Sequence, residues 1–237
     1  MLYNFRTTVA NSDNKMEGIM RIKNGFTLSE VLITLGVIGV ISAITLPTVV
    51  KNYQKHVIEN RLKKSYSIIN QALNMSIAEN GDIKNWTFPQ SNTADENYKF
   101  AQTYLLPYLK VIKDCNVGKG CWADKEYNMN GSNSLQINDI NYIIKFILSD
   151  GSAVALYFSE TGGHLYLDVN GISKPNTRGK DIFEFAITND FVNGSYIKPN
   201  GYQYSSNDVT SKCKGGGTTC AKILMDNGWK FPKDYPW

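Results

Sequence analysis

The feature that most constrains this chain is an apolar run near its N-terminus, Phe26–Leu46, in which Glu30 is the only ionisable side chain. A helix over these 21 residues is about 31 Å long, which matches the hydrocarbon thickness of a bilayer. A buried core helix is the alternative, but such helices are rarely apolar on every face. The run therefore predicts a single membrane span over 26–46.

A short basic segment directly precedes the apolar run. Residues 21–25 are Arg-Ile-Lys-Asn-Gly, and the run then opens with Phe-Thr-Leu-Ser-Glu. No Ala-x-Ala pattern follows Leu46, so the sequence does not predict cleavage by the ordinary signal peptidase. The lone carboxylate of Glu30 at the edge of the span is costly unless it is neutralised or paired, or reaches the lipid headgroups.

This order of a basic leader, a glycine and Phe-Thr-Leu-x-Glu resembles the signal of type IV pilins and type II secretion pseudopilins. The resemblance covers residues 20–80. It implies that a prepilin peptidase cuts between Gly25 and Phe26 and methylates the new Phe26 amine. It also implies that Glu30 pairs with the Phe26 amine of a neighbouring subunit during assembly. Pro47 has the position of the helix-kinking proline that many members of the family carry.

The expected organisation has four parts: a leader peptide (1–25), the transmembrane half of a helix (26–46), its amphipathic half (47–80) and a globular extracytoplasmic head (81–237). Residues 20–25 alone have the length of a typical short leader. The chain therefore has three candidate start residues, which are Met1, Met16 and Met20.

The charges beside the apolar run do not decide its orientation. Four basic residues precede the run and five follow it between residues 51 and 64, although the cytoplasmic side of a span is usually the more basic. The family resemblance and the cysteines favour a cytoplasmic N-terminus, which places the head in the oxidising compartment. The resemblance thus implies a protein of the bacterial inner membrane, with its head in the periplasm or, after assembly, at the cell surface.

Beyond Pro47 the apolar residues recur at steps of three and four as far as Ile77, and Asn80-Gly81 supplies a stop. This spacing predicts one helix over 26–79, whose second half carries a single apolar stripe. A capping-box pattern at 93–96 predicts a short amphipathic helix that Pro107 ends.

The head then changes to strand periodicity. Segments 142–148 and 153–158 flank an Asp-Gly turn, which predicts a hairpin. Segments 164–169 and 182–187 are expected to complete an antiparallel meander. The predicted fold class is α+β, with a long N-terminal helix packed on an antiparallel sheet, and the pilin resemblance implies the same architecture. The aromatic residues at 229–237 are expected to pack the end of the chain onto the sheet.

The four cysteines stand as two local pairs in glycine-containing loops. They allow three pairings, but short loops close readily and favour Cys115 with Cys121 and Cys213 with Cys220. Zinc binding is the alternative, although zinc sites usually space their paired thiolates two to four residues apart. Disulfides that close such short loops are expected to stabilise the head modestly.

The loop 168–181 groups oxygen-bearing side chains beside two glycines. Calcium prefers oxygen ligands, so Asp168, Asn170 and Asp181 are candidate calcium ligands. The loop departs from an EF-hand, because its glycine is fourth rather than sixth and no glutamate closes it. The alternative is a turn-rich connection whose Asp and Asn side chains cap their own backbone. No other cofactor is expected.

The remaining composition excludes several functional classes. A formal charge of +4 over 237 residues is well below the basic loading of nucleic-acid-binding proteins, so no nucleic-acid partner is predicted. The sequence has no serine-hydrolase, phosphate-loop or zinc-protease motif, and we expect no enzyme. His56 and His164 are interpreted as surface or packing residues.

The resemblance to type IV pilins and pseudopilins therefore implies a structural subunit of a type II secretion pseudopilus or a type IV pilus. Its expected partners are the prepilin peptidase, other pilin or pseudopilin subunits, the membrane and the inner-membrane assembly platform. In the alternative, the chain is a single-pass membrane-anchored binding protein that does not polymerise. The sequence does not decide between a secretion pseudopilus and a surface pilus.

Overall fold

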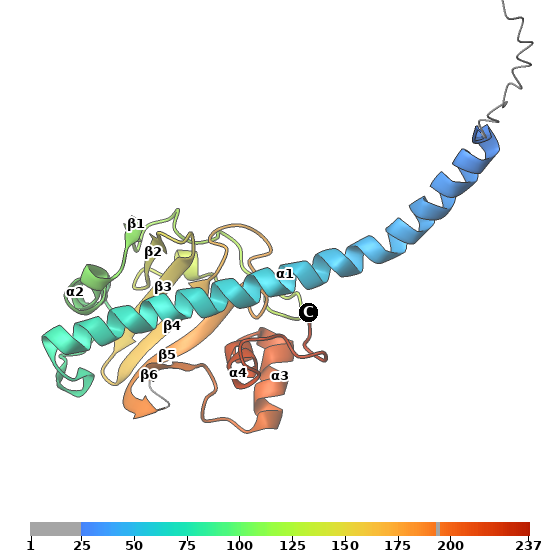
Figure 1. Cartoon of the computed structure of the whole chain (residues 1–237). Coiled ribbons are helices and arrows are strands. Elements are labelled where there is room, and N and C mark those ends of the chain that lie inside the picture. The colour runs from blue at the N-terminus through green and yellow to red at the C-terminus, as the bar shows by residue number, and fades with distance from the viewer. Residues whose placement is uncertain (1–24, 193–194) are drawn as a thin grey trace, which may run out of the picture. The chain divides into compact units, whose positions relative to one another are not determined.

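The computed structural model describes residues 25–192 and 195–237 (Figure 1). The expectations for the leader up to residue 24, including the start residues Met1, Met16 and Met20, lie outside the described residues. The chain divides into two compact units, one ending at Thr48 and the other spanning Val49–Trp237. The first helix contributes residues to both units.

Helices form both ends of the described chain, and they are α1 (Leu28–Asn80), α2 (Ala94–Tyr104), α3 (Ser206–Gly216) and α4 (Cys220–Asp226). The predicted long helix is thus present as α1, which runs through Pro47 without interruption. The predicted short helix is α2, and the Thr93 side chain accepts a hydrogen bond from the Glu96 amide at its start. α2 ends at Tyr104, and Pro107 lies in the following 3-10 turn.

A single six-stranded antiparallel sheet forms the centre of the head, with its strands in sequence order: β1 (Val111–Asn116), β2 (Ile144–Leu148), β3 (Ala153–Ser159), β4 (Gly162–Asp168), β5 (Ile182–Val192) and β6 (Ser195–Pro199). The predicted hairpin is the β2–β3 pair, in which Ile144 lies opposite Leu156. Gly151 in its turn has a φ of +87°, a conformation that glycine adopts at little cost. The predicted α+β class is confirmed.

The structure adds elements that the sequence pattern did not predict. β1 and β6 flank the four expected strands, and β5 extends well beyond Ile187. The segment around Cys213 and Cys220, expected to be a flexible loop, is instead the junction of α3 and α4. That expectation was wrong because Gly217 ends α3 in the left-handed conformation rather than forming a mobile loop.

The two faces of the sheet are buried by different parts of the chain. Alternate residues of β3, such as Val154 and Leu156, belong to one apolar core together with α1. The residues between them, Ala153 and Ala155, belong to a second core with Trp122. This alternation follows from the period of two in a strand. The head therefore has three layers, with α1 crossing the first face of the sheet (Figure 1).

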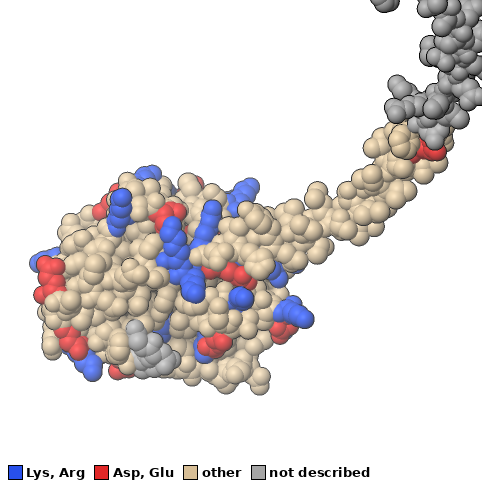
Figure 2. Space-filling model, in the orientation of Figure 1, with Lys and Arg blue, Asp and Glu red and all other residues tan. Residues whose placement is uncertain are grey.

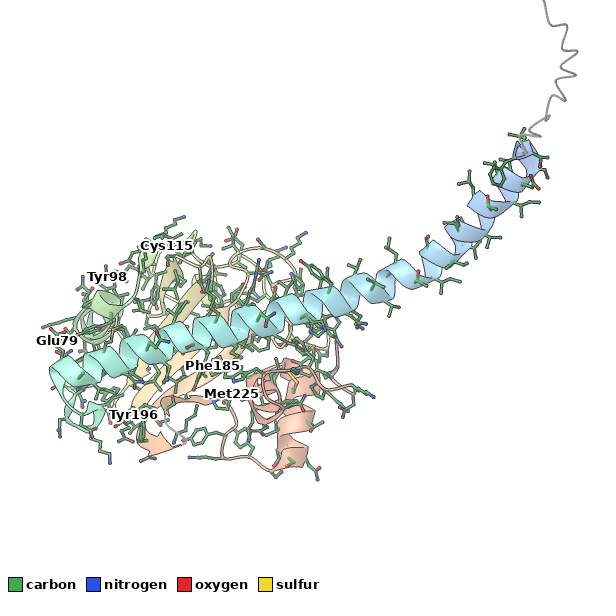
Figure 3. All side chains as sticks on the ribbon, viewed as in Figure 1. Glu79, Tyr98, Cys115, Phe185, Tyr196 and Met225 are labelled. Carbon is green, nitrogen blue, oxygen red and sulfur yellow. A yellow bond between two sulfur atoms is a disulfide. The ribbon has the colours of Figure 1, made fainter. Side chains whose placement is uncertain are left out.

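α1 buries an apolar stripe against the first face. The stripe comprises Ile58, Leu62, Ile69, Ala72 and Leu73, each at most 8% exposed. Full burial of one large aliphatic or aromatic side chain contributes about 1.5–3 kcal/mol. Tyr66 reaches from α1 to Phe185 of β5, with ring centroids 5.4 Å apart. Figure 3 labels Phe185 beside the ribbon of α1. The predicted packing of the helix on the sheet is present.

The C-terminal aromatic residues pack mainly against α1 rather than only on the sheet as expected. Trp229 contacts Tyr66 of α1 with ring centroids 4.8 Å apart. The Phe231 amide donates to Glu59 Oε1 at 2.7 Å, and the Lys55 ammonium lies 5.5 Å from the Trp237 ring centroid. The end of the chain is therefore held by polar and cation–π contacts with the helix.

The cysteines form the favoured pairing. Cys115 is bonded to Cys121 and Cys213 to Cys220, and no free cysteine remains among the described residues. The first bond joins β1 to the segment that covers the second face. The buried Lys145 holds the same segment, since its ammonium donates to the Val117 carbonyl at 2.8 Å.

A buried charge cluster lies on the second face of the sheet. Arg178 Nη1 is 2.5 Å from Glu184 Oε1, and Arg178 Nε is 3.7 Å from Glu126 Oε2. The guanidinium also lies 5.5 Å from the Tyr166 ring centroid. Burial raises the pKa of both Glu126 and Glu184, and the positive charge of Arg178 partly offsets that rise. Arg178 is thus the cation on which two buried carboxylates depend.

We predict that Arg178→Gln destabilises the head by about 3–5 kcal/mol, because it leaves two buried carboxylates without their cation. A carboxyl whose pKa is raised by folding contributes stability at low pH that is lost as the pH rises through the folded pKa. The deficit should therefore be smaller at about pH 5 than at about pH 8. Denaturant unfolding of the variant at both pH values measures this difference.

The matched control is Lys222→Gln, which removes a cation from the Lys222–Asp226 pair on the surface. We expect this change to cost less than about 1 kcal/mol. An Arg178→Gln deficit as small as that of the control, or one that does not depend on pH, would contradict the role assigned to Arg178.

Candidate functional site

The predicted cleavage site lies just before the first turn of α1. Residues 25–27 are not helical, and α1 begins at Leu28. Thr27 and Glu30 cap this end reciprocally. The Thr27 amide and hydroxyl donate to Glu30 Oε2 at 2.8 and 2.9 Å, and the Glu30 amide donates to Thr27 Oγ1 at 3.2 Å. This is a capping box, which satisfies backbone donors that the first helical turn leaves free.

This cap is a contact that the sequence analysis missed, although a threonine three residues before a glutamate is its usual signature. Both bonds from Thr27 end on Glu30 Oε2. Within the described residues no group donates to Glu30 Oε1. One carboxylate oxygen is therefore engaged within the chain, and the other is available to a donor from outside it.

The N-terminal part of α1 has no cover within its own chain. Every residue from 25 to 50 is exposed, including Leu28 at 78% and Ile44 at 71%. The most apolar stretch of α1 has a mean hydropathy of 2.2, and it meets the length and composition expected of a membrane span. Figure 2 shows almost no charged side chain on this described part of the helix. So large an apolar surface requires lipid or other helices around it.

Pro47 lies inside α1, next to the division between the two units at Thr48. A proline within a helix removes one backbone hydrogen bond and crowds the preceding turn. Pro47 thus lies within the uncovered part of α1, before the first buried residue of the helix, Ile58.

The candidate calcium residues come together at one end of β4 and β5. Asp168 and Asp181 are both fully buried. Asp168 Oδ1 accepts from the Asn170 amide at 3.2 Å, while Asp181 accepts from the Asn176 and Thr177 amides at 2.8 and 2.7 Å. The loop is therefore also the turn-rich connection that was the alternative, because both carboxylates cap backbone amides.

Three side-chain oxygens of this loop nevertheless lack a donor. Asp168 Oδ2, Asn170 Oδ1 and Asn176 Oδ1 are buried without any hydrogen-bond partner among the described residues. Burial and the neighbouring charge of Asp181 raise the pKa of Asp168 well above its usual value. Burial likewise raises the pKa of Asp181 to about 6. The loop thus holds two buried acids and unpaired oxygens, and neither acid forms an ion pair with any of the described residues.

The loop fits a hard cation better than zinc. Among the residues that the structure describes, no group of three or more His, Cys, Asp or Glu side chains is placed to hold a metal. A cation between Asp168 and Asp181 therefore needs amide or carbonyl oxygens to complete its shell, as calcium sites commonly do. Zinc is also excluded for the four cysteines, because all of them are in disulfides.

The two histidines lie apart from this loop. His56 Nδ1 is 2.9 Å from Glu59 Oε2 on α1. His164 stacks on the Tyr157 ring with centroids 4.7 Å apart. Both are in the structural surroundings expected of surface or packing residues.

A pocket of about 480 Å³ beside the loop is a feature that the sequence analysis did not predict. Its charged lining residues are Arg61 of α1 together with Lys174, Lys180 and Asp181 of the loop. The lysines and arginines that follow the apolar run were noted in the sequence, but they were used only to consider the orientation of the membrane span. The loop side of the pocket is more than 100 residues away in sequence, so no local pattern joins the two sides.

Comparison with known proteins assigns the two ends of the chain to different families. The prokaryotic N-terminal methylation motif matches residues 20–46, which confirms the prepilin-type signal predicted from the sequence. A family of unknown function, DUF6613, matches residues 48–237. No curated protein and no solved structure matches the chain. The chain therefore belongs to the family DUF6613, and carries the type IV prepilin signal and an apolar, pilin-like helix in front of it.

Proposed function

We propose that this protein is a structural subunit of a type IV pilus or a type II secretion pseudopilus. One observation carries the proposal: the prepilin signal lies directly in front of a helix whose apolar surface is exposed at every residue up to 50. In the membrane, lipid covers this surface. In a filament, the corresponding helices of neighbouring subunits cover it, so assembly exchanges lipid contacts for helix contacts.

The proposed orientation puts the N-terminus in the cytoplasm and the head outside it. The two disulfides support this side for the head, since disulfides persist in oxidising compartments and are rare in the cytosol. We propose that the mature chain begins at Phe26, with a membrane anchor at 26–46, the remaining helix at 47–80 and the head at 81–237. Its partners are then the prepilin peptidase, the assembly platform and other subunits of the filament.

Processing requires a peptidase to hydrolyse the Gly25–Phe26 peptide bond and a methyl group to be transferred to the new Phe26 amine. A glycine before the bond lets an extended backbone approach the enzyme closely. A Cβ added at Gly25 meets no atom of the described residues beyond its neighbours in the chain within 4 Å. A larger residue at this position therefore interferes with the peptidase and not with the fold of the substrate.

We predict that Gly25→Val blocks cleavage while the protein still folds and enters the membrane. N-terminal mass analysis of membrane fractions should show the parent beginning at methylated Phe26 and the variant retaining residues before Phe26. Gly36→Val is the control, because Gly36 also has open space around its Cβ position but lies within the helix. Normal processing of Gly25→Val would contradict the assignment of the cleavage site.

Glu30 is proposed to set the register between subunits. Its Oε2 is engaged by Thr27, which leaves Oε1 for the Phe26 amine of a neighbouring subunit. A charge-assisted hydrogen bond in surroundings without water is stronger than one in water. The amine exists only after cleavage, so processing and assembly are linked through this pair.

We predict that Glu30→Gln is processed and stays in the membrane but enters filaments at least about tenfold less, because the variant keeps the cap and loses the charge. Thr27→Ala is the matched control, since it loses the cap at a cost of about 1 kcal/mol and keeps the charge. Sheared filaments and envelopes are compared by quantitative mass spectrometry. Equal filament entry of Glu30→Gln and the parent would exclude the register role.

The same fractions test the finer assignments. Mature chains in sheared surface material indicate a surface pilus, whereas mature chains confined to the envelope indicate a secretion pseudopilus. An uncut chain, together with harmless changes at Glu30, would support the alternative of an anchored binding protein that does not polymerise.

We further propose that the loop 168–181 binds calcium through Asp168, Asn170 and Asp181. The unpartnered oxygens Asp168 Oδ2 and Asn170 Oδ1 support this proposal, as does the burial of two carboxylates in one loop. A divalent cation supplies the positive charge that these groups lack. Bound calcium then fixes the end of the β4–β5 connection.

We predict that calcium raises the thermal unfolding midpoint of the chelator-treated protein. Saturation at about 100 times the dissociation constant corresponds to about 2.7 kcal/mol of stabilisation. Asp168→Asn should abolish this shift, and Asp190→Asn, an exposed acid elsewhere, should retain it. An unchanged midpoint of the parent on addition of calcium would exclude the site.

A further inference from the structure

The pocket between α1 and the loop 168–181 has an excess of positive charge. Arg61, Lys174 and Lys180 line it, and its single acid is Asp181. Both oxygens of Asp181 already accept backbone amides. Within residues 25–192 and 195–237, none of the three cations has an ion-pair partner. This basic pocket, defined by its three cations, is therefore open to an anionic partner.

The same chain has a negative surface where α1 ends. Glu79 lies in the last turn of this helix, which contains no basic residue, and Asp82 follows it by three residues. The free carbonyls at a helix C-terminus add the negative end of the helix dipole. Residues 78–82 are all exposed, and Figure 3 labels Glu79 at the C-terminal end of the α1 ribbon. We call residues 79–82 the acidic turn.

The two carboxylates of the acidic turn each have an oxygen available. Glu79 Oε2 accepts from the Tyr108 hydroxyl, and Asp82 Oδ1 accepts from the Lys84 amide, both at 2.9 Å. No described residue donates to the second oxygen of either acid or forms an ion pair with it. A Cβ added at Gly81 would meet nothing within 4 Å, so the turn is open to a partner on this side.

Charge is unevenly distributed along the part of α1 that belongs to the head. Residues 49–64 contain five Lys or Arg and one acid, whereas Glu79 is the only charged residue of 65–80. Figure 2 shows Lys and Arg side chains gathered over the part of the head that α1 crosses. Lys51 and Lys55 contact Trp237 at the end of the chain. Arg61 remains free and extends this basic surface into the pocket.

The basic pocket and the acidic turn are too far apart to meet within one head. Arg61 and Glu79 lie on the same uninterrupted helix, eighteen residues apart. Such a helical segment is about 27 Å long, whereas an ion pair requires its nitrogen and oxygen to lie within about 4 Å. A small anion bound in the pocket would leave the acidic turn without a cation. A second copy of the chain, displaced along α1, supplies a partner for both surfaces.

We propose that the basic pocket of one subunit binds the acidic turn of a second copy of this chain. The inference rests on the proposed filament and identifies a contact between its heads. Arg61, Lys174 and Lys180 face Glu79 and Asp82 of the second copy. The two surfaces lie at different places on the chain, so the contact is heterologous, and its repetition can add subunits without closing a ring.

Chemical coupling in filaments of the full parent chain tests the contact without any substitution. A carbodiimide joins a lysine amine to a carboxyl group that touches it, with loss of water, and mass spectrometry of the digested filaments identifies the joined peptides. We expect Lys174 or Lys180 to be coupled to Glu79 or Asp82. The distance within one head excludes the same product inside a single chain. The calcium concentration is held constant, because a cation at Asp181 would add to the positive charge.

Charge reversal tests the contribution of the contact to assembly. The pocket-reversed variant carries Arg61→Glu, Lys174→Glu and Lys180→Glu, and the turn-reversed variant carries Glu79→Lys and Asp82→Lys. Each should enter filaments at least about tenfold less than the parent, because like charges that face each other across an interface are strongly unfavourable. Co-expression of the two variants should restore entry to within about twofold of the parent, since each reversed surface then meets its complement.

Two control variants reverse the same number of charges at exposed positions elsewhere. One carries Lys110→Glu, Lys125→Glu and Lys214→Glu, and the other carries Glu160→Lys and Asp190→Lys. Both should enter filaments as the parent does. The amount of each variant in the membrane is measured in parallel, and where a reversed variant is depleted there, the coupling in parent filaments decides.

Three results would overturn the proposal. They are equal filament entry of the reversed variants and the parent, no restoration by co-expression of variants that reach the parental level in the membrane, and parent filaments whose chains are coupled only through other residues. Coupling of the pocket lysines to a different protein would assign the pocket to another partner and also contradict it. Absence of the parent from all filaments contradicts the proposed subunit role, whereas a parent that assembles without this contact contradicts only this inference.

Discussion

Burial of the α1 stripe on the first face of the sheet is the contact on which the rest of the head depends. Without α1, the inward side chains of β2 to β5 would form a large exposed apolar surface. Polar contacts then fix where the helix lies along the sheet. Ser65 donates to Asp150 at 2.9 Å, and Tyr66 donates to the Ile197 carbonyl at 3.0 Å. The apolar stripe supplies the stabilisation, and these bonds supply the register.

The other face depends on polar contacts to a greater degree. The segment that covers it contains little regular structure, and it is held by the Cys115–Cys121 bond, the Lys145 ammonium and the Arg178 cluster. Fully satisfied buried polar groups specify one arrangement, while each unpaired group is costly. The two faces are therefore covered in different ways. The first is stabilised by the burial of apolar surface, and the second by a few specific bonds.

Local signals in the sequence account for much of this fold. The β2–β3 hairpin, the start of α2 and both disulfides were predictable, because each is decided by residues close together in the chain. β1 was not, since two irregularities interrupt its pairing with β2 and its side chains alternate poorly. α3 was missed because its glycine-rich end resembles a loop in sequence.

The candidate sites divide in the same way. The prepilin-type signal is a short linear motif, so it was recognisable without a structure, and the proposed roles of Gly25, Phe26 and Glu30 follow from their places in it. The pairing of Asp168 with Asp181 was suggested by a shared loop, but the unpartnered oxygens became visible only with the side chains in place. The Arg178 cluster and the pocket between α1 and the loop 168–181 each join residues that are distant in sequence. Charged residues so far apart in the chain leave no local sequence pattern, so their proximity could not be predicted from the sequence.

The reciprocal bonds between Thr27 and Glu30 also have a consequence for the proposed cleavage of the Gly25–Phe26 bond. By ending the helix at Leu28, the cap keeps the Gly25–Phe26 bond in non-helical backbone. A protease binds its substrate as extended chain. In a helix, the N–H and C=O groups around a peptide bond are hydrogen-bonded within the helix and are not available to the enzyme. A helix that continued toward the leader would hide this bond. Under the proposed processing, the same glutamate sets the boundary between the leader and the mature chain.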